Sequence, residues 1–321
     1  LALTRQGWTG TAEQGAAADA SAPVLQGLDV DAGRLEAIGR RLNDIRVTAR
    51  RSGDDWRLDL RGREVAGTGV WSAATVGAPN GRLVARLTRL TVPSEGDLVP
   101  WSGAAEARGE RKDDPGNPWP TLDVEADAFV ARGRDLGRLE LVAQPRGNDW
   151  EIARMALSNE GGRLDAEGTW RVAGAQQQTK LDVTFDLKET GTFLGRLGYP
   201  DQIVGAPAKV TGQLAWTGAP NEFDFPSLNG TFRVQTGAGR FTKVDPGPGK
   251  LLGVLSLQAL PRRITLDFRD VFSEGFAFDD INGTVRIRNG VLTTDNFRLA
   301  GPAAQVTIAG DADLARETQR L

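Results

Sequence analysis

Alternating apolar and polar residues, repeated in short runs along most of the chain, constrain the fold more than any other feature of the sequence. One such run carries Leu181, Val183 and Phe185 at every second position. A period of two places these side chains on one side of an extended strand. Residues typical of turns separate the runs, as at 52–55 and 145–148. The pattern therefore predicts a mostly β protein of short antiparallel strands joined by hairpin turns.

A weak internal repeat accompanies the alternation. Asp55-Trp56 is matched by Asp149-Trp150, and the Gly-x-Trp motif that ends in Trp71 is matched by the one that ends in Trp170. Trp216 closes a third, partial copy. Repetition on this scale predicts an elongated β array in which each unit packs on the next.

The array divides most naturally at a polar stretch, residues 93–120, that is rich in charged residues, Pro and Gly. Such a stretch predicts a solvated loop between units. We expect a β-repeat unit at 1–115, a second at 116–200 that ends in a short helix, and a C-terminal β unit at 201–321. They would form one continuous array rather than independent domains.

Two apolar stretches break the period of two and are typical of short helices. Residues 187–197 place apolar side chains at helical spacing and are followed by Pro200, and residues 248–260 do the same before Pro261. Residues 35–42 suggest a further helical turn or a connector. Composition and spacing alone therefore predict an elongated, mostly β fold of antiparallel strands with short apolar helices embedded in it.

Composition removes several classes of function. The 321 residues include no Cys and no His, which excludes thiol and imidazole catalysis, disulfides and zinc sites with those ligands. The 39 basic and 42 acidic residues are well mixed, so we expect no nucleic-acid partner. Adjacent acidic pairs, such as Asp113-Asp114, lie in turn-like contexts and seldom converge on one site. We therefore expect no enzyme, no catalytic residue, no metal and no cofactor.

The apolar side of the strands has two interpretations. It could be the packed core of a β-sandwich, or it could line an open groove, and the alternation alone does not distinguish them. The residues that would line a groove are Leu181, Val183, Phe185, Val210, Leu214, Trp216, Phe232, Val234, Ile264, Leu266, Phe268, Val285 and Ile287.

Several longer motifs carry a family resemblance. They include Leu228-Asn-Gly-Thr-Phe232, a Leu-rich run at 249–263, Gly301-Pro-Ala-Ala304 and Leu314-Ala-Arg-Glu-Thr-Gln319. Through them residues 223–317 resemble the YhdP family of AsmA-like bacterial envelope proteins, which are bridge-like lipid-transfer proteins. Residues 122–200 look similar to the same family. Residues 1–90 resemble it only in their general pattern, without a matching motif.

The resemblance implies a non-enzymatic lipid conduit. Family members are anchored in the inner membrane by an N-terminal helix, cross the periplasm and carry an apolar groove along a curled sheet. They move phospholipid between the inner and outer membranes and support the outer-membrane barrier. This sequence lacks the N-terminal membrane helix, so we expect it to be a C-terminal section of such a protein. Its partners would be phospholipid acyl chains and, through the rest of the protein, both membranes.

The resemblance also sharpens the expectations for the helix at 248–260. We expect Leu251, Leu252 and Leu255 to pack into the concave side of the sheet as a plug or gate of the groove. Arg262 and Arg263 follow as possible head-group contacts, although charges after a helix are more often simply solvated. The alternative to a conduit is a purely structural envelope spacer with a closed β-sandwich core.

Overall fold

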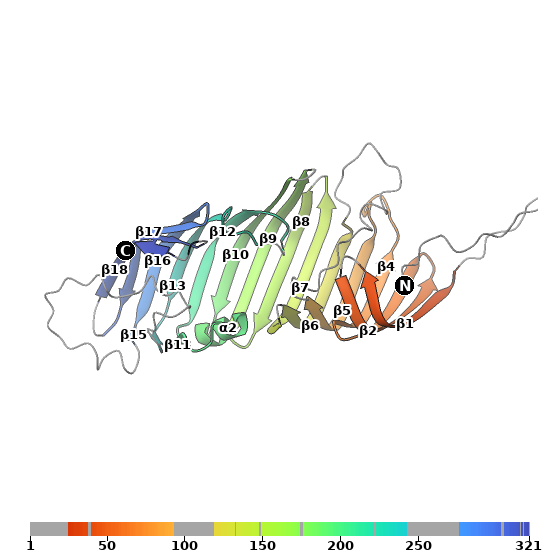
Figure 1. The fold of residues 1–321 in the computed structure, drawn as a ribbon, viewed down its shortest axis with the longest axis horizontal. Coiled ribbons are helices and arrows are strands. Elements are labelled where there is room, and N and C mark those ends of the chain that lie inside the picture. Colours follow the sequence, from red (N-terminus) through yellow and green to blue (C-terminus); the bar gives the residue numbers. More distant parts are fainter. Residues whose placement is uncertain are drawn as a thin grey trace, which may run out of the picture.

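The computed structural model describes residues 25–37, 40–92, 119–131, 133–147, 149–173, 176–220, 223–242, 276–302, 305–314, 316 and 318–320. Within them, a single sheet of sixteen strands forms the body of the molecule (Figure 1). Its strands are β1 (Gly27–Ala37), β2 (Arg40–Ser52), β3 (Asp55–Arg61), β4 (Val65–Ser72), β5 (Arg82–Val92), β6 (Thr121–Ala131), β7 (Arg134–Arg146), β8 (Asp149–Asn159), β9 (Gly162–Ala173), β10 (Gln176–Leu187), β12 (Ala208–Thr217), β13 (Asn229–Thr236), β16 (Asp280–Arg288), β17 (Val291–Ala300), β18 (Gln305–Asp313) and β19 (Thr318–Arg320).

The strands follow one another across the sheet in chain order, so nearly every strand pairs with its neighbours in sequence. The sheet is long, curled and open, and it confirms the predicted fold class (Figure 1). Its strands are longer than the predicted short ones, since β2 and β7 each contain 13 residues. The helical turn suggested at 35–42 is wrong, because Leu35 pairs with Leu42 across the β1–β2 hairpin.

One pair of neighbours, β5 and β6, is parallel, whereas the sequence predicted antiparallel pairing throughout. Leu83 lies opposite Leu122, and Ala85 lies opposite Val124, in the same direction of the chain. Two parallel neighbours require a connection that returns to the starting edge of the sheet. The polar stretch 93–120 that separates them therefore joins two runs of antiparallel strands at a parallel seam.

The two sides of the sheet differ sharply in chemistry. One side, which we call the inner face, carries the apolar residues of each alternating strand, and the other, the outer face, carries the charged ones. In β10 the inner residues Leu181 and Val183 are 6% and 7% exposed, while the outer residues Lys180 and Asp182 are exposed. Among the described residues no second full layer covers the inner face, so its burial follows from the curl of the sheet.

Tryptophans line one edge of the inner face, and we call this edge the tryptophan rim. Trp56 pairs with Trp71 across β3 and β4, and Trp150 pairs with Trp170 across β8 and β9. Trp216 lies at the same edge near the end of β12. The repeated Trp positions in the sequence thus correspond to repeated cross-strand pairs at one rim of the sheet.

The opposite edge, the helix rim, is covered by added elements. They are the helix α2 (Thr190–Leu197) and a small sheet of β11 (Ile203–Gly205), β14 (Gly239–Phe241) and β15 (Phe276–Phe278). Figure 1 shows α2, β11 and β15 along this edge. The predicted helix at 187–197 is therefore confirmed, and the one predicted at 248–260 lies outside the described residues.

The helix α2 is firmly attached to the inner face. Phe193 is 3% exposed and meets Phe185 edge-on, with ring centroids 6.1 Å apart. Glu189 caps the helix by accepting a hydrogen bond from the Thr192 amide, and its other oxygen accepts one from the Gly205 amide at 2.6 Å. A left-handed Gly198 ends the helix. The helix therefore closes the inner face at this rim over β9, β10 and β12.

Candidate functional site: the inner face of the sheet

Ten of the predicted groove residues are described, and the structure brings them together on the inner face of four neighbouring strands. Several of them are direct cross-strand partners: Leu181 lies opposite Leu214, Phe185 opposite Val210, and Phe232 opposite Val285. The ten are Leu181, Val183, Phe185, Val210, Leu214, Trp216, Phe232, Val234, Val285 and Ile287.

The remaining predicted site residues cannot be placed. Ile264, Leu266 and Phe268, the gate residues Leu251, Leu252 and Leu255, and the head-group residues Arg262 and Arg263 all lie outside the described residues. Their roles stay predictions.

Burial divides the ten residues into two groups. Leu181, Val183, Trp216 and Ile287 are buried, whereas the other six are half-buried. The half-buried group, for example Phe232, still presents apolar surface that nothing in the described part of the chain covers completely. The inner face is therefore neither a fully packed core nor a fully exposed surface.

The apolar surface continues far beyond these four strands. From β5 to β18, the paired inner positions in the middle of the strands carry no charged side chain. They include Leu83, Ala85, Leu87, Val124, Ala126, Leu139, Leu141, Ile152, Met155, Leu164, Ala166, Leu292, Phe297 and Ile308. The polar exception in the middle of these strands is Thr294 on β17, whose hydroxyl donates to the Thr284 carbonyl at 2.9 Å, so an apolar chain on this path would meet mainly carbon-rich side chains and glycines.

Three tryptophans interlock at the rim over β6 to β9. The rings of Trp119 and Trp170 have centroids 5.6 Å apart, and Trp150 meets both, at 6.2 Å from Trp119 and 6.1 Å from Trp170. Neighbouring strands lie about 4.8 Å apart, so a flat sheet would separate β6 from β9 by about 14 Å. The long indole side chains of Trp119 and Trp170 thus reach over the two intervening strands and meet at this rim.

Hydrogen bonds fix these rings. Trp150 Nε1 donates to the Pro120 carbonyl at 3.1 Å, and Trp170 Nε1 donates to Gln177 Oε1 at 3.2 Å. The repeat pointed to Trp150 and Trp170 but missed Trp119, which precedes β6 in the Pro-rich stretch. The only available signal was an aromatic residue among turn-forming ones, which does not specify a partner.

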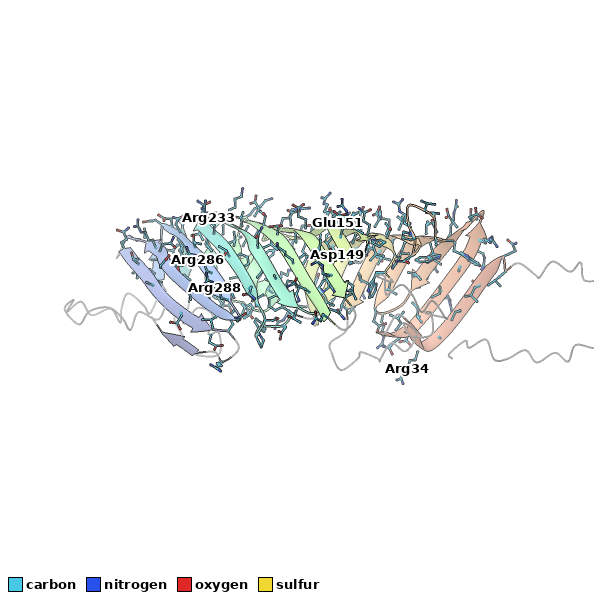
Figure 2. The ribbon with its side chains drawn as sticks, turned by 90° about the horizontal axis from the view of Figure 1, so that it is seen from above. Arg34, Asp149, Glu151, Arg233, Arg286 and Arg288 are labelled. Atoms are coloured by element: carbon cyan, nitrogen blue, oxygen red, sulfur yellow. The ribbon has the colours of Figure 1, made fainter. Side chains whose placement is uncertain are left out.

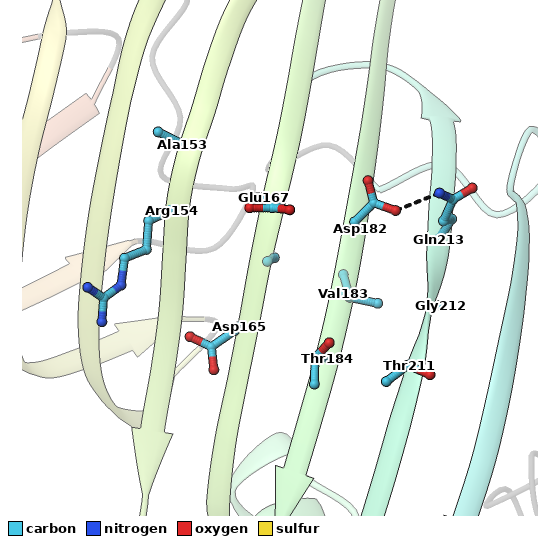
Figure 3. A pocket seen from close by; sticks show the side chains of 11 residues that line it. Ala153, Arg154, Asp165, Glu167, Asp182, Val183, Thr184, Thr211, Gly212 and Gln213 are labelled. Carbon is cyan, nitrogen blue, oxygen red and sulfur yellow. Dashed lines mark hydrogen bonds between the residues drawn. The ribbon is translucent and has the colours of Figure 1, made fainter.

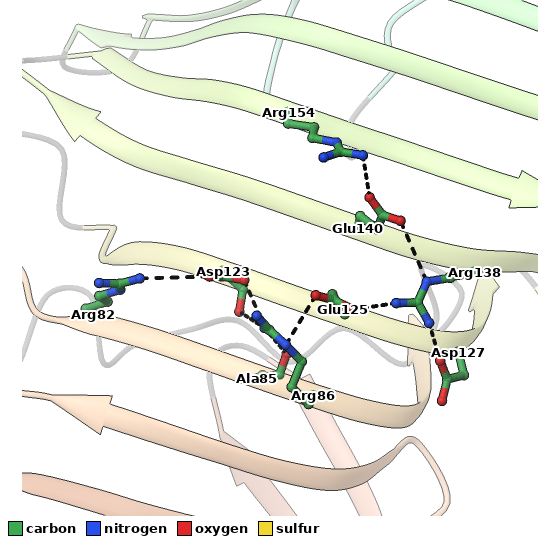
Figure 4. A network of polar contacts seen from close by, with 9 residues as sticks. All are labelled: Arg82, Ala85, Arg86, Asp123, Glu125, Asp127, Arg138, Glu140 and Arg154. Carbon is green, nitrogen blue, oxygen red and sulfur yellow. Dashed lines mark hydrogen bonds and ion pairs between the residues drawn. The ribbon is translucent and has the colours of Figure 1, made fainter.

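The outer face from β5 to β9 is tied together by ion pairs. Arg86 contacts Asp123 at 2.9 Å and Glu125 at 3.2 Å, and Glu125 also pairs with Arg138 (Figure 4). Glu140 continues the chain to Arg154 at 2.7 Å. This network crosses the parallel seam between β5 and β6. It keeps the charged groups on the side of the sheet opposite the apolar path.

A surface pocket also lies on the outer face. It encloses about 580 Å³ between β8 and β12, and Figure 3 shows polar side chains around it. Glu167 and Asp182 lie directly opposite each other there, and Asp182 accepts a hydrogen bond from Gln213 at 2.6 Å. Among the described residues no group of three acidic side chains is placed to hold a metal ion. The chemistry of this pocket does not suit an acyl chain.

One acidic group at the helix rim has a shifted pKa. Burial opposes the charge of Glu189, but hydrogen bonds from the Thr192, Gly205 and Gly191 amides outweigh this cost and lower its pKa below the ordinary value of 4.5. Glu189 therefore stays ionised at neutral pH and holds α2 to the segment that follows it.

Comparisons with known proteins identify the family of this chain. The family model described as "YhdP protein" matches residues 2–321. The chain belongs to the YhdP family. A curated relative from Escherichia coli (strain K12), named "Intermembrane phospholipid transporter YhdP", is 30% identical over 199 residues. The match covers 62% of this chain and 16% of that relative. This YhdP-family chain thus spans a small part of its relative's length, and no solved structure matches it. Within the described residues no helix is long and apolar enough to cross a membrane.

Proposed function

We propose that this chain is a section of a periplasm-spanning lipid conduit whose inner face carries phospholipid acyl chains between the inner and outer membranes. The protein would support the outer-membrane barrier by supplying phospholipid, with no chemical reaction of its own. The full-length protein would be anchored in the inner membrane, and this section would lie in the periplasm. The relative's name, an intermembrane phospholipid transporter, supports the class of substrate.

The observation that carries the proposal is the uninterrupted apolar path from β5 to β18. Each CH₂ group removed from water contributes about 0.8 kcal/mol, so an acyl chain gains from every strand it covers. Because the surface changes little from strand to strand, the chain could slide without crossing a polar barrier. Figure 2 shows charged residues such as Glu151 and Arg233 on the sheet, and both belong to its outer face.

The alternative function is a structural spacer whose inner face is only a core. The burial of Leu181, Trp216 and Ile287 favours it, because these side chains leave little surface for a ligand. The half-buried residues favour the conduit. The two functions therefore differ in whether Phe232 and its neighbours contact lipid or only one another.

Lipid uptake by the delipidated chain separates the two functions. We expect the chain to take up phospholipid from solution, and we expect Phe232→Glu to reduce uptake at least fivefold by placing a carboxylate on the apolar path. Gln235→Glu is the matched control, since Gln235 is an exposed outer-face residue on the same strand and lines neither outer-face pocket. Bound lipid would be counted by mass spectrometry, with circular dichroism to verify that each variant is folded. A folded wild-type chain that takes up no lipid would exclude the conduit and favour the spacer.

A further inference from the structure

The outer face near the C-terminal end of the sheet contains a second pocket with different chemistry. It encloses about 330 Å³ over β10, β12, β13 and β16. Its cationic residues are Lys180, Arg286 and Arg288, and no Asp or Glu lines it. The neutral residues are Gln213, Leu214, Ala215, Asn229, Gly230, Thr231 and Ile287. We call it the basic pocket.

The register of the strands explains the shape of the basic pocket. Lys180 lies opposite Ala215 on β12, and Arg286 lies opposite Thr231 on β13. Long cationic side chains therefore border short ones, which leaves a depression between them. Arg286 and Arg288 project from the same side of β16, two residues and about 7 Å apart. Lys180 faces them across three strand spacings, or about 14 Å.

The charges of this region are not balanced like those nearer the N-terminus. From β5 to β9 the outer-face cations Arg86, Arg138 and Arg154 all contact carboxylates. In the basic pocket Arg286 has one partner, Asp295 at 3.3 Å, and neither Lys180 nor Arg288 has an ion-pair partner among the described residues. Figure 2 shows Arg286 and Arg288 together on this part of the sheet.

A rigid turn holds the Arg288 end of the pocket. Asn289, the next residue, has a left-handed φ of 49°, and Gly290 follows with φ 77°. The Asn289 amide donates to Asn229 Oδ1 at 3.2 Å, which ties the turn to β13. Asn229 Nδ2 in turn donates to the Ser227 carbonyl at 2.8 Å. The backbone that carries the cation is therefore preorganised, and an anion would need to order only the side chains.

We propose that the basic pocket binds a phosphate group. Three cations from two strands border one depression that has no carboxylate in its lining, which suits a multiply charged oxyanion, and guanidinium groups match phosphate oxygens in pairs. The site lies on the opposite side of the sheet from the apolar path, so it is independent of the proposed conduit. The phosphate could belong to a lipid head group at a membrane surface or to a soluble phosphate compound.

Two probes distinguish these sources. Pyrophosphate, titrated calorimetrically into the 321-residue chain at low ionic strength, tests a soluble ligand, and vesicles of phosphatidylglycerol and phosphatidylcholine test a lipid head group in a sedimentation assay. We expect saturable binding of at least one probe that weakens as salt is raised. Binding of pyrophosphate indicates a soluble source, and binding of the vesicles alone indicates a membrane source.

Substitutions link the binding to the pocket. Arg288→Gln and Lys180→Gln should each weaken binding of the active probe about fivefold, which is the effect expected for one exposed ion pair. Arg171→Gln is the matched control, because Arg171 lies on the same face but already pairs with Asp149 at 3.0 Å. It removes the same charge and should leave the affinity within twofold of wild type. The proposal is overturned if neither probe binds, or if the three variants weaken binding equally.

Discussion

Gly168 shows at the scale of one residue how closely the backbones of neighbouring strands approach each other in this sheet. It lies on the inner face between Ile152 and Leu181, with a φ of 157°. A Cβ added there would come within 2.0 Å of the Lys180 carbonyl oxygen. Gly212, opposite Val183, is equally crowded, at 2.2 Å from the Thr231 carbonyl oxygen. The backbones of neighbouring strands approach closely at these points because no side chain intervenes.

Replacing Gly168 tests this role. We expect Gly168→Ala to lower the free energy of unfolding by about 2 kcal/mol, because the added methyl group must displace the backbone of β10. Gly33→Ala is the control, since a Cβ at position 33 would meet nothing within 4 Å. Urea unfolding of the two variants measures the difference. Equal stabilities would show that the close approach at Gly168 is not required.

Single residues also show how far the sequence could predict the candidate site. The matched Trp56 and Trp150 were visible as a repeat, and the period of two assigned Phe232 and Val285 to the apolar side. Neither signal could predict that Trp119 would reach the ring of Trp170. That contact depends on the position of Trp119 just before β6 and on a partner three strands away, and the alternation of residues specifies neither.

At the scale of elements, α2 closes the helix rim through contacts of a few residues. Its apolar spacing and its terminal Gly198 made it predictable, because a helix of this length is specified locally. The small sheet beside it was not predictable. Its strands have three residues each, and they pair Ile203 with Phe241 and Phe241 with Phe276, which are far apart in the chain. The parallel seam was also missed, because the alternation of apolar and polar residues does not indicate whether two neighbouring strands run parallel or antiparallel.

The cap of α2 should make stability depend on pH. The pKa of Glu189 is lower in the folded chain than its ordinary value of 4.5, so its contribution is complete above about pH 4.5 and is lost as the pH falls through the folded pKa. We expect Glu189→Gln to lower the free energy of unfolding by about 1 kcal/mol at pH 7. Urea unfolding should show this difference shrinking below pH 4.5. A difference that stays constant down to pH 3 would contradict the proposed role of the charge.

The parallel seam offers a second test among the elements. Glu125 links Arg86 on β5 to Arg138 on β7, but all three side chains are at least one-third exposed. We expect Glu125→Gln to cost less than about 1 kcal/mol at low salt and almost nothing at 1 M salt, because water and ions screen exposed pairs. Urea unfolding at both salt concentrations measures this. A large loss that persists in 1 M salt would mean that the network stabilises the seam by more than exposed charge pairing.

At the scale of the whole molecule, the fold separates two kinds of surface along its length. Period-two alternation predicted this separation, and the register, which is antiparallel everywhere except between β5 and β6, extends it from strand to strand. The division into units at 1–115, 116–200 and 201–321 stays a prediction, although the sheet runs without a break from β5 to β6 and from β10 to β12. The sequence could not decide between a core and a groove, because both need the same apolar residues and differ only in how closely the sheet curls.

The conduit is tested most directly by cross-linking lipid from defined positions on the sheet. A photoreactive phenylalanine analogue would replace Phe232 or Leu164 on the inner face, or Arg233 on the outer face, in chains purified with bacterial phospholipid. If acyl chains follow the apolar path, mass spectrometry will find phospholipid adducts at 232 and 164 and essentially none at 233. Adducts at 233 as abundant as those at 232, or no adduct at either inner position, would contradict the proposal that the inner face carries lipid.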